Sequence, residues 1–121
     1  MIARLALLFA IVATNASAQT AFDECQQAGR LDCVQYFVDH TESLMNDTFR
    51  AVMSSSLGDM VKASIREEQA KFMAFVRGSC RAFAFRDYDQ RFAKLYADRC
   101  LSDAFKFRES MLTGYLSRAN N

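Results

Sequence analysis

Residues 65–80 read IREEQAKFMAFVRGSC, and the meaning of this stretch decides the class of protein. Ile65, Phe72 and Val76 recur at spacings of seven and four, which is the period of an amphipathic helix. Gly78 and Ser79 then precede Cys80 and indicate that the helix ends there. Cys80 as a nucleophile would make the chain an enzyme, as a metal ligand a metalloprotein, and as half of a disulfide a small exported module.

The same helical spacing of apolar residues extends along the rest of the chain. It predicts helices over residues 31–54, 58–78 and 89–117, with a turn at Ser54–Asp59 where serine and glycine favour caps. The chain has no proline and only four glycines, fewer turn residues than a sheet of several strands needs. Between the second and third helices, residues 81–90 are expected to form a strand-like or irregular loop. The predicted apolar faces comprise Leu31, Val34, Val38, Met45, Phe49 and Val52; Val61, Ile65, Phe72, Phe75 and Val76; and Phe92, Tyr96, Leu101, Ala104, Phe105, Met111, Leu112 and Tyr115.

The N-terminus has the pattern of a secretory signal peptide. One cation, Arg4, precedes an apolar run over residues 5–13, and Ala16-Ser17-Ala18 forms a small-residue cleavage site. The run is shorter than the ~20 residues that span a bilayer. We therefore expect residues 1–18 to be removed, leaving one helical domain over residues 19–121 without a membrane span, secreted or in a bacterial periplasm.

The cysteines are expected to form disulfides. Cys25, Cys33, Cys80 and Cys100 all lie in the mature part, and an even number of cysteines in a short exported chain is typical of a disulfide framework. Their spacings lack the close pairs of a zinc site. The single histidine, His40, is predicted to lie in mid-helix, where it does not serve a cysteine nucleophile. No metal, cofactor or catalytic group is therefore expected.

Three pairings of four cysteines exist, and two of them compete. If the first two helices form a hairpin that turns near Leu57, Cys33 and Cys80 lie side by side, and Cys25 then pairs with Cys100. Pairing of Cys25 with Cys33 and of Cys80 with Cys100 is the alternative. Because eight residues of straight helix span ~12 Å, that local pairing needs a bend, which Gly29 could provide. The crossed pairing is favoured. The predicted fold is all-α, a small antiparallel three-helix bundle held by two disulfides.

Charge and composition exclude some partners and leave an interaction role. Removing residues 1–18 leaves 103 of the 121 residues with 14 basic and 14 acidic side chains, because Arg4 is lost from the 15 basic ones. A chain with this balance lacks the basic surface of a nucleic-acid binder. Its acidic side chains form no pair placed for acid–base catalysis, and Glu67 and Glu68 beside Arg66 and Lys71 suggest a solvated helix face. We expect a binding protein and not an enzyme.

The cysteine frame and the residues around it resemble the LprI-type lysozyme-inhibitor domain. The family has an acidic residue, Leu-Asn and an aromatic after its second cysteine, then Gln, Trp and a third cysteine, and finally a fourth cysteine followed by Arg and Leu. Phe72 stands at the tryptophan position and Val76 at an arginine position. The matching positions are Glu42, Met45-Asn46, Phe49, Gln69, Phe72, Cys80, Cys100, Arg108 and Leu112.

The resemblance implies a small secreted helical module that blocks a lysozyme. The polar residues Glu42, Asn46, Gln69 and Arg108 are expected to be structural, hydrogen-bonded to one another where the helices meet, because part-buried polar groups need partners.

A lysozyme has two carboxylates in its cleft, and arginine or tyrosine suits contact with them. The loop after Cys80 supplies the candidates for this contact: Arg81, Phe83, Phe85, Arg86 and Tyr88. The alternative is a periplasmic structural or accessory module with another protein partner, which the 11 phenylalanines support through an exposed apolar edge.

Overall fold

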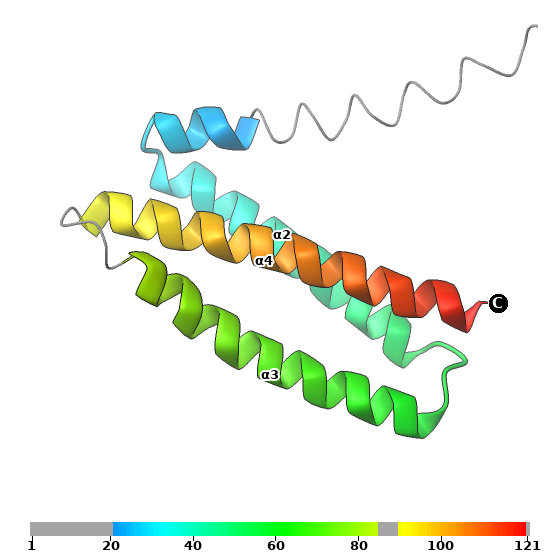
Figure 1. Ribbon diagram of the computed structural model, residues 1–121. Coiled ribbons are helices and arrows are strands. Elements are labelled where there is room, and N and C mark those ends of the chain that lie inside the picture. The colour runs from blue at the N-terminus through cyan, green and yellow to red at the C-terminus, as the bar shows by residue number, and fades with distance from the viewer. Residues whose placement is uncertain (1–20, 85–89, 121) are drawn as a thin grey trace, which may run out of the picture.

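The structure is a computed structural model that describes residues 21–84 and 90–120 of the chain. These residues form a helical segment over residues 21–27, followed by α2 (Leu31–Met53), α3 (Asp59–Ala84) and α4 (Gln90–Ala119) (Figure 1). No strand occurs within these two ranges. The predicted all-helical class is confirmed. The predicted bundle of three helices is incomplete, because residues 21–27 add a further helical segment.

Helix α3 continues six residues beyond its predicted end at Gly78. Gly78 has no positive φ and lies within the helix, so it does not act there as a C-terminal cap. Arg81 and Ala82 follow it, and both are good helix formers. Residues 81–84 are therefore helical, and the expectation of a strand-like or irregular loop is wrong for them. Residues 85–89 lie outside the described part of the chain.

Side-chain contacts show how the helices run relative to one another. Thr41 lies against Ser102 and Thr48 against Glu109, with the same sequence offset of 61 in both pairs, so α2 and α4 run in the same direction. Helix α3 runs the opposite way, as Figure 1 shows. Helix α4 thereby packs against both other long helices. None of the helices in the described part of the chain combines the length and hydropathy needed to cross a bilayer.

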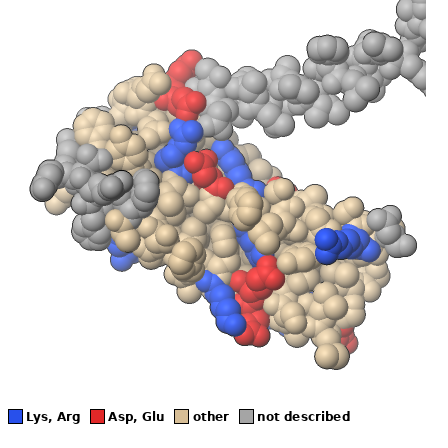
Figure 2. All heavy atoms as spheres, viewed as in Figure 1, with Lys and Arg blue, Asp and Glu red and all other residues tan. Residues whose placement is uncertain are grey.

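Charged side chains are distributed over the surface as neighbours of opposite sign. Lys71 pairs with Glu67 one turn away on α3, and Arg50 pairs with Asp47 on α2. Figure 2 shows acidic and basic side chains next to one another on the face that it presents, with broad uncharged surface between them. Exposed pairs of this kind contribute only about 0–1 kcal/mol to stability, so the fold depends on its core and its disulfides.

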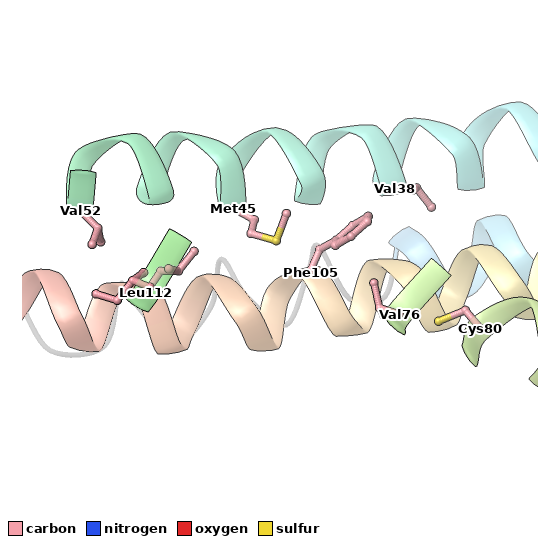
Figure 3. Packing of buried hydrophobic residues seen from close by; sticks show 8 residues of the cluster. Val38, Met45, Val52, Val76, Cys80, Phe105 and Leu112 are labelled. Atoms are coloured by element: carbon pink, nitrogen blue, oxygen red, sulfur yellow. The ribbon is translucent and has the colours of Figure 1, made fainter. Parts of the chain in front are cut away.

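The main hydrophobic core lies between the three long helices. Val38, Met45 and Val52 repeat every seven residues on α2 and face Phe105 and Leu112, which have the same spacing on α4 (Figure 3). Full burial of side chains of this size contributes about 1.5–3 kcal/mol each. Helix α3 completes this core with Ile65, Val76 and Cys80.

A second cluster fixes the N-terminal helical segment. Phe22 is fully buried with Cys25, Val34 and Leu95, and its ring meets Phe37 edge-on with centroids 5.0 Å apart. The segment therefore packs at the end of the bundle where α2 and α4 begin.

Both disulfides form, but the favoured pairing is wrong. Cys25 is bonded to Cys33 and Cys80 to Cys100, with Cα–Cα distances of 6.0 and 5.4 Å. Gly29 has a φ of 65°, a conformation that glycine adopts without a Cβ clash, and its turn returns the chain so that Arg30 N–H binds the carbonyl of Cys25. The straight-helix distance that counted against local pairing does not apply across this turn.

The pairing of Cys80 depends on the lengths of α3 and α4. Helix α3 extends past this residue and α4 begins ten residues before Cys100, so the two helices place these cysteines opposite each other. Cys33 packs in the second cluster instead, away from Cys80.

Candidate functional site

A buried arginine joins α3 to α4. Arg108 is only 2% exposed, and its Nε donates a hydrogen bond of 2.8 Å to the side-chain oxygen of Gln69. Another guanidinium nitrogen, NH1, pairs with the carboxylate of Glu68. The guanidinium carbon lies 5.7 Å from the centre of the Phe72 ring. Burying a charge is costly unless it is paired and hydrogen-bonded, and these contacts meet most of that requirement.

The partner carboxylate is itself held from a second side. Tyr115 donates its hydroxyl to Glu68 at 3.1–3.2 Å, while Glu68 remains about half exposed. Arg108 NH2 has no hydrogen-bond partner among the described residues. Gln69 in turn places its amide nitrogen 3.7 Å from the sulfur of Met45 on α2. Arg108, Gln69 and Glu68 therefore link the three long helices, and we call this group the buried junction.

The other two predicted polar residues lie apart from this junction. Glu42 on α2 pairs with Arg77 on α3 at 2.9 Å, at the margin of the bundle. Asn46 is half-buried and forms no side-chain hydrogen bond within the described residues. Of the four, only Gln69 and Arg108 contact each other.

Sequence reasoning missed the role of Glu68. Its neighbour Glu67 does form the expected exposed pair with Lys71. The sequence analysis assigned Glu68 to the same solvated face, whereas its side chain pairs with Arg108 on α4. The available signal was Arg108, a charged residue within an apolar stripe, which requires an anionic partner on the facing helix.

The candidate lysozyme-binding residues follow Cys80 in the sequence and precede Cys100. Arg81 is exposed in the last turn of α3. Phe83 belongs to the same turn, but its side chain is not described. The remaining candidates, Phe85, Arg86 and Tyr88, lie outside the described residues, between Ala84 and Gln90. The structure therefore describes the base of the segment between Cys80 and Cys100. There the disulfide joins α3 to α4, and Cys80 is fully buried.

Several residues assigned to apolar core faces are instead exposed. Phe92, Tyr96 and Met111 on α4, and Val61 and Phe75 on α3, lie at the surface. Helical spacing groups residues on a face, but it does not say whether another element covers that face. Phe107, which the sequence pattern left out, is exposed as well.

Potential metal ligands do not gather in the described part of the chain. No cluster of three or more histidine, cysteine or carboxylate side chains suited to a metal ion occurs there. His40 is exposed on α2 and stacks on Tyr36 with ring centroids 6.0 Å apart. All four cysteines are in disulfides.

The chain matches the model of a known protein family. The profile of the family described as Lysozyme inhibitor LprI matches residues 17–112, a range that contains both disulfides and the Arg108–Gln69 pair. Neither the curated proteins nor the solved structures provide a match. Since the family match covers most of the 121 residues, the chain belongs to the LprI lysozyme inhibitor family.

Proposed function

We propose that this protein is an exported binding protein that inhibits a lysozyme by placing the segment between Cys80 and Cys100 in the enzyme's substrate cleft. The observation that carries this proposal is the Cys80–Cys100 disulfide, which closes the base of that segment in a chain of the LprI family. The segment contains the arginine and tyrosine residues that suit the contact.

The chemistry of the target sets what the segment has to present. A lysozyme cleft holds two carboxyl groups on either side of the bond that it cleaves. Arg86 offers a planar guanidinium that can bind a carboxylate through two hydrogen bonds, and Tyr88 offers a phenol hydroxyl beside an apolar ring. Phe83 and Phe85 supply apolar area next to them. A protein that binds in this way has no need for catalytic groups of its own.

The fold supports the proposal by fixing both ends of the segment. Cys80 belongs to the main core, and Leu95 anchors the first turns of α4 in the second cluster. A segment held at both ends loses less conformational freedom on binding, which favours affinity. Arg81 is exposed beside this base and extends the same contact surface.

The two disulfides also support export of the protein. Disulfides persist in oxidising compartments such as the bacterial periplasm, and this chain has two. We assign residues 1–18 to a signal peptide that is removed, and residues 19–121 to the mature domain in the periplasm or outside the cell.

A lysozyme turnover assay tests the function. The purified, disulfide-bonded protein is added at micromolar concentration to lysozymes of several structural classes, and cell-wall hydrolysis is followed by turbidity. We expect inhibition of at least one class, weakened by Arg86→Ala and by Tyr88→Ala. Arg118→Ala is the matched control, because Arg118 lies in the last turn of α4, at the far end from the disulfide (Figure 1).

Two results would count against this function. Absence of inhibition of every lysozyme would remove it, and recovery of a different specific partner from periplasmic extract would then favour an accessory module. Equal inhibition by the Arg86→Ala and wild-type proteins would place the contact elsewhere on the surface.

A further inference from the structure

Helix α3 contains a glycine that nothing within the described part of the chain requires. Gly78 lies inside the helix without a positive φ, and a Cβ added to it would meet no atom within 4 Å. Glycine destabilises a helix interior relative to alanine, because it loses more backbone entropy on folding. Glycine also serves where another molecule approaches the backbone closely. The surface around Gly78 therefore fits a contact with a partner.

The neighbours of Gly78 on the exposed side of α3 are uncharged. Ala74, Phe75 and Ala82 are exposed as Gly78 is, and Phe75 is 73% exposed. At 3.6 residues per turn these four positions lie within an arc of about 100°. We call these four residues the Gly78 face. It presents one large aromatic ring beside three positions whose side chains have at most one carbon atom, so a partner can approach the helix closely there.

The Gly78 face is continuous with the base of the proposed inhibitory segment. Gly78 stands two residues before Cys80, whose disulfide closes that base. Arg77 and Arg81 are the charged residues of this part of α3, and both lie outside the arc. Arg81 is exposed at its edge and pairs with no carboxylate among the described residues. An unpaired guanidinium beside an uncharged surface is complementary to a cleft that holds carboxyl groups.

The segment alone is too small for a stable inhibitory contact. Its ends, Cys80 and Cys100, are 20 positions apart, and Leu95 and Asp98 between them are buried in the protein itself. A specific protein–protein interface takes about 20–30 residues from each partner. Part of the contact therefore has to come from surface next to the segment, and the Gly78 face adjoins the segment on α3.

We propose that the Gly78 face packs against the wall of the lysozyme cleft while the segment between Cys80 and Cys100 enters the cleft. The Phe75 ring supplies an apolar contact, and Arg81 faces the carboxyl groups of the enzyme. The missing side chain at Gly78 lets the enzyme surface lie directly against the backbone of α3. This inference rests on the inhibitory function proposed above and adds to it a second contact surface.

Two matched glycine variants test this contact in the lysozyme assay. Gly78→Gln should weaken inhibition roughly tenfold, because overfilling a close contact forces the two surfaces apart. Gly114→Gln is the control and should leave inhibition unchanged. Gly114 is also exposed inside a helix and meets no atom within 4 Å of an added Cβ, but it lies in the C-terminal part of α4.

The stability of the two glycine variants separates a lost contact from a damaged fold. Glutamine favours a helix more than glycine does, so both variants should have a higher thermal unfolding midpoint than the wild-type protein. Weaker inhibition by a more stable Gly78→Gln protein then reports the contact and not unfolding.

A pair of phenylalanine variants tests the aromatic contact. Phe75→Ser should weaken inhibition roughly tenfold, since truncating an aromatic anchor of an interface commonly has an effect of that order. Phe107→Ser is the control, because Phe107 is 67% exposed but lies on α4, outside the Gly78 face, and it should leave inhibition unchanged.

The results distinguish this inference from the function on which it rests. If Arg86→Ala weakens inhibition while Gly78→Gln inhibits as well as Gly114→Gln does, the segment binds the enzyme and the inference about the Gly78 face is wrong. Equal losses in Phe75→Ser and Phe107→Ser would also overturn it. If the wild-type protein inhibits no lysozyme, the function itself is wrong and this contact is wrong with it.

Discussion

Arg108 on α4 donates a hydrogen bond of 2.8 Å from its Nε to the side-chain oxygen of Gln69 on α3, and both side chains are buried. This contact lies at the positions where the LprI pattern places glutamine and arginine. Two neighbours, Glu68 and Phe72, surround the same guanidinium. Three positions of the family pattern, Gln69, Phe72 and Arg108, thus meet where α3 packs against α4.

Replacing Arg108 by methionine should lower the free energy of unfolding by about 1–3 kcal/mol, because Gln69 is then left buried without its donor. The loss stays in this range because Glu68 is half exposed and can be hydrated. Arg77→Met is the control, since Arg77 forms an exposed interhelical pair with Glu42, and it should cost less than about 1 kcal/mol. Urea unfolding measures both. Equal losses in the two variants would show that the buried network has no special role.

Gly29→Ala should destabilise the protein by about 1–2 kcal/mol, because an alanine pays a steric cost at a φ of 65°. Gly78→Ala should act in the opposite direction and stabilise by about 0.5–1 kcal/mol, since Gly78 lies inside α3 and an added Cβ meets no atom within 4 Å. The thermal unfolding midpoint should therefore fall for Gly29→Ala and rise for Gly78→Ala. Destabilisation by Gly78→Ala would contradict the observed continuation of α3.

Phe22→Ala should detach the N-terminal helical segment and leave the three long helices in place. Phe22 contacts Phe37 and lies under the guanidinium of Arg99, whose carbon is 4.8 Å from the ring centre. We expect hydrogen exchange of the backbone amides of residues 21–27 to become fast, while exchange in α2 around Met45 changes little. Uniformly faster exchange throughout the chain would show instead that the second cluster and the main core unfold together.

The helices were predictable because the spacing of their apolar residues and the turn residues at their ends indicate the same boundaries. Val38, Met45 and Val52 define the buried face of α2, and Ser54–Ser56 end that helix within one residue of the predicted position. The end of α3 was not predictable in the same way. A glycine in a sequence is read as a stop signal, whereas an exposed glycine that meets no neighbour is tolerated in a helix.

Pairings between distant residues depended on geometry that periodicity does not contain. The turn at Gly29 decides the partner of Cys25, and the length of α3 decides that of Cys80. The Gln69–Arg108 contact could be anticipated because each residue lies beside an apolar stripe. Exposure of Tyr96 could not, since an aromatic residue at helical spacing looks the same on a covered and on an uncovered face.

The central functional claim is that the segment closed by Cys80 and Cys100 is the inhibitory element. The most direct measurement compares lysozyme inhibition by two matched variants, Cys80→Ser/Cys100→Ser and Cys25→Ser/Cys33→Ser. Each loses one disulfide and about 2–4 kcal/mol of stability in the chain-entropy account, so their overall cost is similar. We predict that the first variant loses inhibition and the second, measured where both remain helical, retains it. Full inhibition by the Cys80→Ser/Cys100→Ser protein, or equal loss in both, would contradict the account.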